Sequence, residues 1–120
     1  MLMSKQVFIV EDDEFLQEIS ATKLTKAGFV ITTANDGEKA LKILGASYVP
    51  DCVLMDLMMP SSVDGFGVIE YIRKNDALKK VPIIAFSNMS DDESIARAKK
   101  LGANEFMIKS NFTLDLKHFS

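Results

Sequence analysis

Charged and hydroxyl side chains follow directly on short apolar runs at several places in this 120-residue sequence. They are Glu11, Asp12 and Asp13 after the run at 7–10, Asp56 after 52–55, Ser87 after 83–86, and Lys109 after 106–108. A charge at the end of a buried segment is costly unless a partner compensates it. We therefore expect these side chains to act as one group.

The chemistry that fits such a group is the transfer of a phosphoryl group. Carboxylates at close range repel one another, so their pKa values rise unless a cation lies among them. A site with few protein oxygens, completed by water, suits Mg²⁺. An aspartate such as Asp56 can attack phosphorus and form an aspartyl-phosphate. The transferred oxygens then need a metal ion, an ammonium and a hydroxyl donor, and Lys109 and Ser87 offer the last two.

The elements that must position these residues alternate between strands and helices. Apolar runs at 7–10, 30–34, 52–55, 83–86 and 106–108 predict five short strands. Helical patterns lie between them. One helix is expected at 14–27 with Asp13 as N-cap, and another at 65–75. Two more are expected after capping boxes, one formed by Asn35 and Glu38 and one by Ser90 and Glu93, and a short last helix starts at Thr113.

This alternation predicts an α/β fold with right-handed crossovers. The first, third and fourth runs are apolar throughout, as expected of strands covered on both faces, whereas the runs at 30–34 and 106–108 suit sheet edges. We expect a doubly wound five-stranded parallel sheet of order 2-1-3-4-5, a flavodoxin-like three-layer sandwich, formed by residues 1–120 as one domain. Ligands of such sheets bind at the carboxyl ends of the strands, where the polar group falls.

Composition and charge exclude several classes of function. The net charge of −3, with no cluster of Lys or Arg, argues against direct binding of nucleic acid. No apolar stretch approaches the ~18 residues of a membrane span. The single cysteine, Cys52, cannot form an internal disulfide, and we read it as an inert buried thiol. We expect a cytoplasmic protein without a membrane partner. His118 has no metal-ligand spacing and receives no role.

The segments "VFIVEDDE", "VLMDLMMP", "DG", "IIAFSN" and "FMIKS" together resemble the receiver domain of two-component response regulators. The likeness covers essentially the whole chain, in order and at matching spacings. It implies that Asp56 is the phospho-acceptor. It also implies that Mg²⁺ is bound by Asp12 and Asp56, by Glu11 largely through water, and by the backbone carbonyl of Met58.

The resemblance also implies a conformational switch. Ser87 would bind a phosphoryl oxygen on modified Asp56, and Lys109 would pair with the carboxylate before transfer and with the phosphoryl group after it. Phe106 matches an aromatic residue that turns inward as the hydroxyl moves. The implied partners are a sensor histidine kinase or histidine phosphotransfer protein, and a downstream output protein or domain. Such a domain is no enzyme beyond its own phosphorylation and dephosphorylation.

The sequence departs from the family at several places beside the site. Ser110 follows Lys109 where the family usually has proline, Asn88 replaces a common alanine, and the loop at 61–63 contains one extra residue. Met58 and Met89 occupy the positions that flank the attacking water in this family. Neither side chain can orient water by a strong hydrogen bond, so we predict a long-lived phosphorylated state unless Asn88 turns inward.

Two other functions are alternatives to the phospho-accepting switch. The first is a pseudo-receiver that serves as a constitutive protein-interaction module. Such domains usually lose the acceptor, the metal-binding acids or the lysine, and this sequence keeps all of them. The second is a phosphatase-type hydrolase that uses an aspartate at a strand end. It would need a second acid two residues after Asp56, where Met58 stands.

Overall fold

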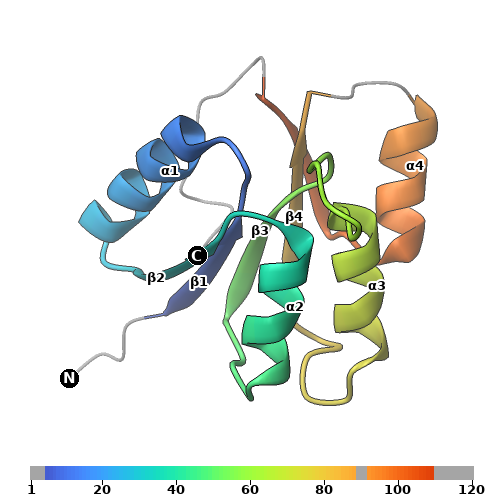
Figure 1. The fold of residues 1–120 in the computed structure, drawn as a ribbon, viewed down its shortest axis with the longest axis horizontal. Helices are drawn as coiled ribbons and strands as arrows, with labels where there is room; N and C mark the ends of the chain where they lie inside the picture. The colour runs from blue at the N-terminus through green and yellow to red at the C-terminus, as the bar shows by residue number, and fades with distance from the viewer. Residues whose placement is uncertain (1–4, 89–91, 110–120) are drawn as a thin grey trace.

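The computed structural model describes residues 5–88 and 92–109, which form a parallel sheet with helices on both faces (Figure 1). In chain order the elements are β1 (Gln6–Val10), α1 (Glu14–Lys26), β2 (Val30–Ala34), α2 (Gly37–Gly45), β3 (Cys52–Asp56), α3 (Gly65–Lys74), β4 (Ile83–Ser87), α4 (Asp92–Leu101) and β5 (Glu105–Ile108). The strand order β2-β1-β3-β4-β5 confirms the predicted topology. The helix predicted from Thr113 lies outside the described residues.

Burial explains why each segment takes its place in the sheet. Every residue of β3 and β4 is buried, because these strands have neighbours on both sides and helices on both faces. The edge strand β2 buries only Ala34, and β5 is half-buried throughout. The continuous apolar runs therefore mark the centre of the sheet, and the weaker runs mark its edges. No helix in the described part of the chain is long and apolar enough to cross a membrane.

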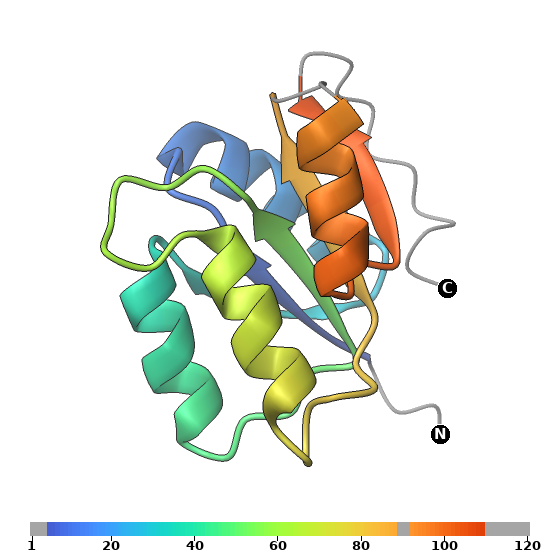
Figure 2. The same ribbon diagram turned by 90° about the vertical axis from the view of Figure 1, so that its right-hand side faces the viewer.

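The two faces of the sheet have separate apolar cores. Among the described helices only α1 packs on one face, where Leu24 shares a core cluster with Ile9 and Leu54 of the strands. Helices α2, α3 and α4 cover the other face and bury residues such as Met55 and Ile69 (Figure 2). Side chains alternate between these faces along each strand. The result is the three-layer arrangement that the sequence predicts.

Aspartate N-caps begin three of the helices. Asp13 is the N-cap of α1, as predicted, and accepts hydrogen bonds from two main-chain amides; Asp64 caps α3 and accepts from the Gly67 amide. The predicted capping box at the start of α2 is wrong, because Asp36 and not Asn35 is the N-cap. Asp36 has the extended backbone of a cap, and its Oδ1 accepts from the Lys39 amide at 2.8 Å. The other predicted box involves Ser90, which lies outside the described residues.

The guanidinium of Arg73, at the end of α3, links segments at the opposite end of the sheet from the polar cluster. It donates hydrogen bonds to the carbonyl oxygens of Gly102, Val81 and Lys79 and to Asn104 Oδ1. Gly102 ends α4 with φ of 123°, and a Cβ there would lie 2.6 Å from Arg73 Nε. Arg73 thereby fixes the turn between α4 and β5 to the segment that precedes β4.

Candidate functional site

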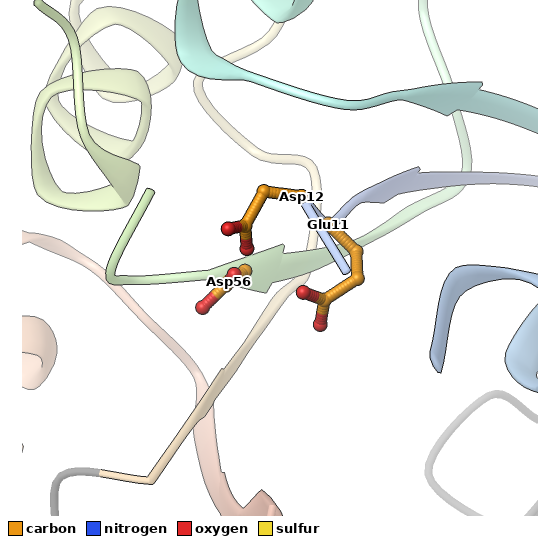
Figure 3. Close-up of side chains that lie close together, drawn as sticks. All are labelled: Glu11, Asp12 and Asp56. Atoms are coloured by element: carbon orange, nitrogen blue, oxygen red, sulfur yellow. The ribbon is translucent and has the colours of Figure 1, made fainter. Parts of the chain in front are cut away.

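Three acidic side chains meet at the carboxyl ends of β1 and β3. Each of Glu11, Asp12 and Asp56 places a carboxylate oxygen within 4.8 Å of the others, and the close-up shows these groups gathered around one space (Figure 3). Glu11 and Asp56 are only 2% and 1% exposed, while Asp12 is half-buried. The topology produces this arrangement because β1 and β3 are paired neighbours whose carboxyl ends lie at the same edge.

Lys109, which directly follows β5, supplies the positive charge at the centre of this cluster. Its Nζ lies 2.8 Å from Glu11 Oε1, 2.9 Å from Glu11 Oε2 and 3.1 Å from Asp56 Oδ2. The lysine side chain is 10% exposed, so solvent screens these interactions weakly. One ammonium facing three carboxyl groups leaves a surplus of negative charge if all three ionise.

Burial and crowding shift the pKa values of these groups. The pKa of Asp56 is raised to about 8, first by burial and then by the neighbouring Asp12 and Glu11, while Lys109 partly opposes the rise. Hydrogen bonding to Asp56 holds the pKa of Asp12 below its ordinary value. Burial acts to lower the pKa of Lys109, but its hydrogen bond to Glu11 and the nearby negative charges raise it on balance. Asp56 is thus the group whose charge is least compensated.

The donor set fits a hard divalent cation. All side-chain donors in the cluster are carboxylate oxygens, the ligands that Mg²⁺ prefers. Two buried oxygens, Glu11 Oε1 and Asp56 Oδ2, accept no hydrogen bond in favourable geometry from the described residues, although both lie near Lys109. A cation beside Asp12 and Asp56 would balance the charge that Lys109 leaves uncompensated.

A cleft opens above Asp56. The residues that line it are Asp12, Asp13, Leu16, Asp56, Met58, Ser87, Asn88 and Lys109. Ser87 ends β4 and is 1% exposed, whereas the Met58 side chain is 58% exposed at the rim. The cleft therefore combines a carboxylate, a hydroxyl and an ammonium with access from solvent, as a small anionic substrate would require.

The backbone at the strand ends is held by Gln17, which the sequence analysis did not single out, and by the close approach of Gly65. Gln17 of α1 donates from Nε2 to the carbonyl oxygens of Glu11 and Ala34, at 3.1 and 3.2 Å. Gly65 begins α3 so close to β3 that a Cβ would overlap the Asp56 carbonyl oxygen. The Asp-Gly pair at 64–65 is a signal for this close approach. A glutamine on α1 gives no comparable signal.

The structure thus brings Asp12, Asp56, Ser87 and Lys109 to one cleft, and the buried Glu11 joins them through its ion pair with Lys109. Asp13 is a helix cap, and its amide also donates to Glu11 Oε2 at 3.1 Å. Phe106 does not line the cleft. It is half-buried in β5 and packs against the core beneath α2, α3 and α4, so it contacts the layer that contains α4.

Residues 7–118 match the family described as the response regulator receiver domain. The chain belongs to this family. It is 36% identical over 105 residues to the transcriptional regulator ycf27 of Guillardia theta, an alignment that covers 88% of this receiver domain and 39% of that protein. The chain spans about two fifths of the length of the curated relatives it matches.

Solved structures of receiver domains share the fold. The chemotaxis response regulator CheY4 of Vibrio cholerae is 27% identical, with a TM-score of 0.81 over 92% of this chain and 90% of that one. The receiver domain of the sensor histidine kinase PA1611 from Pseudomonas aeruginosa is 25% identical, with a TM-score of 0.81 over 92% and 88% of the two chains. The PA1611 structure contains a magnesium ion coordinated in its active site cleft. These likenesses agree with the predicted family and fold.

Proposed function

We propose that this receiver domain accepts a phosphoryl group on Asp56 in a reaction that requires Mg²⁺, and that the change controls an output partner. The observation that supports this most directly is the position of Asp56. This residue is 1% exposed and lines a cleft, and its carboxylate faces both Lys109 and the acidic pair of Glu11 and Asp12. A buried nucleophile beside an ammonium, and beside acids that could hold a divalent cation, suits phosphoryl transfer.

The two oxygens of Asp56 have different surroundings. Oδ1 accepts a hydrogen bond from the Met58 amide at 3.2 Å, while Oδ2 lies 3.1 Å from Lys109 Nζ. In the transfer, one of these oxygens forms a bond to phosphorus as the bond to the donor breaks, and the donor leaves with the electron pair. From a phosphohistidine the leaving group is imidazole, and from acetyl phosphate it is acetate.

The residues around Asp56 would hold the charge of the transferred group. Asp12, Asp56 and the backbone carbonyl of Met58 would bind Mg²⁺, with Glu11 acting largely through water. The bound ion would neutralise charge on the phosphoryl oxygens. The ammonium of Lys109 would shift from the Asp56 carboxylate to a phosphoryl oxygen, and the hydroxyl at position 87 would donate to another.

The proposed partners follow from this chemistry. The donor is a sensor histidine kinase or a histidine phosphotransfer protein, and the recipient of the signal is an output protein or domain.

Residues 1–120 act as one domain that catalyses only its own phosphorylation and dephosphorylation. We place the reaction in the cytoplasm, because Cys52 is a buried free thiol and suits a reducing compartment. A pseudo-receiver is less well supported, because the three acids lie together and Asp12, Asp56 and Lys109 line one cleft.

Phosphorylation by acetyl phosphate tests the proposal. With MgCl₂ present, intact mass spectrometry should detect one added phosphoryl group in the wild-type protein and none in Asp56→Asn. The variant Asp76→Asn is the matched control, because this carboxylate is exposed and remote from the cleft. Asp12→Ala should label very weakly. Labelling that survives in Asp56→Asn would place the acceptor elsewhere and contradict the proposal.

A further inference from the structure

The loop that leads from Asp56 to α3 lies against the N-terminus of α2. Gly37, the first residue of α2, is buried at this contact. A Cβ built on Gly37 would overlap the carbonyl oxygen of Val63 and lie 2.7 Å from its carbonyl carbon and 3.0 Å from its Cβ. The obstacle is backbone, which cannot rotate away as a flexible side chain could. The observed loop conformation therefore requires glycine at position 37.

Hydrogen bonds attach the same part of the loop to α2 and to itself. The hydroxyl of Ser62 donates to Glu38 Oε1 on the first turn of α2. Ser61 Oγ donates to the Val63 carbonyl oxygen at 2.7 Å and accepts from the Val63 amide at 3.1 Å. The segment 61–63 also contains the extra residue that the sequence shows relative to the family.

The other end of the loop carries Met58, whose carbonyl is a proposed ligand of Mg²⁺. Leu57 and Met59 are 0% and 7% exposed and anchor the chain on both sides of the exposed Met58. The Ser61 amide donates to the Met59 carbonyl at 2.8 Å. Only Pro60 separates this anchored segment from Ser61. A displacement of Val63 would therefore also displace the Met58 carbonyl, because the segment between them is short and hydrogen-bonded.

We propose that the N-terminus of α2 is a positioning element of the magnesium site. Gly37 and the Glu38–Ser62 hydrogen bond hold the 57–64 loop in the conformation that presents the Met58 carbonyl to the ion. Neither Gly37 nor Glu38 belongs to the ligand set, so each acts through the loop. The inference rests on the proposed function, since it assumes that the acidic cluster binds Mg²⁺.

Paired glycine substitutions in one helix test this inference. Gly37→Ala adds a Cβ against the Val63 backbone, whereas in Gly45→Ala the new Cβ meets only Tyr71 Oη, at an ordinary 3.7 Å. Titration of the unphosphorylated full chain with MgCl₂, followed by backbone amide chemical shifts, gives the dissociation constant. Loss of an outer-shell support raises it by about 10-fold. We expect this rise in Gly37→Ala and wild-type affinity in Gly45→Ala. Equal affinities in both variants would overturn the inference.

A second pair of variants covers the case in which Gly37→Ala does not fold. Glu38→Ala removes the acceptor of the Ser62 hydrogen bond, while Glu38→Gln removes the charge but keeps an oxygen acceptor. We expect weaker Mg²⁺ binding in Glu38→Ala and recovery in Glu38→Gln. Equal loss in both variants would show a simple charge effect and overturn the inference. If the wild-type chain itself bound no Mg²⁺, the proposed function would fail instead, so the two failures are distinguishable.

Discussion

Lys109 is paired more closely with Glu11 than with Asp56. Its ammonium contacts both oxygens of the Glu11 carboxylate, at 2.8 and 2.9 Å, and lies 3.1 Å from Asp56 Oδ2. Glu11 thus holds the ammonium in place before any phosphoryl group arrives. Because Glu11 and Asp56 are both almost fully buried, the compensation of their negative charge depends on the Lys109 ammonium.

Replacement of Lys109 by methionine is expected to destabilise the metal-free fold. The variant keeps most of the side-chain volume but leaves two buried carboxyl groups without their cation, which costs about 3 kcal/mol. Urea denaturation in EDTA measures the change in the free energy of unfolding. Lys74→Met is the control, since its ion pair with Glu70 is exposed, is screened by solvent and contributes little to stability. Equal losses in the two variants would contradict the proposed charge balance.

The raised pKa of Asp56 predicts a pH dependence of stability in the absence of metal. The folded protein keeps a proton on Asp56 up to about pH 8, whereas the unfolded chain releases it near 3.8. The folded state therefore binds more protons between these values, and this contribution to the free energy of unfolding falls as the pH rises through them. It is lost above pH 8.

Asp56→Asn should remove this component, so the difference in stability between wild type and variant should grow in favour of the variant from pH 4 to 8. Each unit of pKa shift corresponds to about 1.4 kcal/mol, and Mg²⁺ should reduce the difference by stabilising the ionised carboxylate. Denaturant titrations at several pH values, with and without MgCl₂, measure it. A difference independent of pH would show that Asp56 is not perturbed.

The exposed Met58 predicts slow loss of the phosphoryl group. Hydrolysis needs a water molecule held in line with phosphorus, and a thioether at the rim of the cleft cannot orient one by a strong hydrogen bond. Met58→Asn supplies an amide at the same place and should accelerate the loss, measured by intact mass over time. Met58→Leu is the apolar control and should keep the wild-type rate. If Asn and Leu behaved alike, this side chain would not set the lifetime.

The surface of α4 and β5 is expected to respond to activation. Among the described residues of α4 only Ala98 is buried, so the helix buries little of its surface. Beryllofluoride with Mg²⁺ imitates the phosphorylated aspartate, and the resulting changes in amide chemical shift should concentrate in α4 and β5. Changes confined to α2 would contradict this expectation, because α2 is proposed as a static support.

A cation–π contact stabilises α4 against α3, and its removal should loosen the helix. The Arg97 guanidinium lies 4.1 Å from the centroid of the Phe66 ring, an interaction worth about 0.5–1 kcal/mol at an exposed site. Arg97→Ala should therefore accelerate hydrogen exchange of the α4 amides more than Lys99→Ala, which removes an exposed cation from the same helix. Equal exchange rates in the two variants would show that the contact does not hold α4.

The sheet and its polar edge could be predicted from the sequence because central parallel strands are buried on both faces. The bounds of β3 and β4 differ from the prediction by one residue. Asp56 and Ser87 belong to the strands, since Asp56 pairs with Phe86 and Ser87 with Ile108 in the sheet. Main-chain pairing thus continues past the last apolar side chain, which hydropathy alone does not reveal.

Contacts between side chains distant in sequence could not be predicted in the same way. Lys109 and Glu11 are 98 residues apart, and a strand-end rule places them near each other without saying which carboxylate the ammonium prefers. The network around Arg73 and the contact of Gly37 with Val63 depend on how helices and loops lie against one another. Local propensity contains no information about either relationship.

The hydrogen bonds of Arg73 also determine how α4 can move. They hold the turn at Gly102, so the C-terminal end of α4 is anchored and the rest of the helix can tilt about that end. Ten residues of α-helix measure about 15 Å, so a tilt of about 10° would carry the opposite end through ~3 Å. Ser87 precedes the N-terminal end of α4, so a displacement there would tilt this exposed helix about its anchored end. An arginine far from the proposed phosphorylation site thereby fixes the point about which the helix turns.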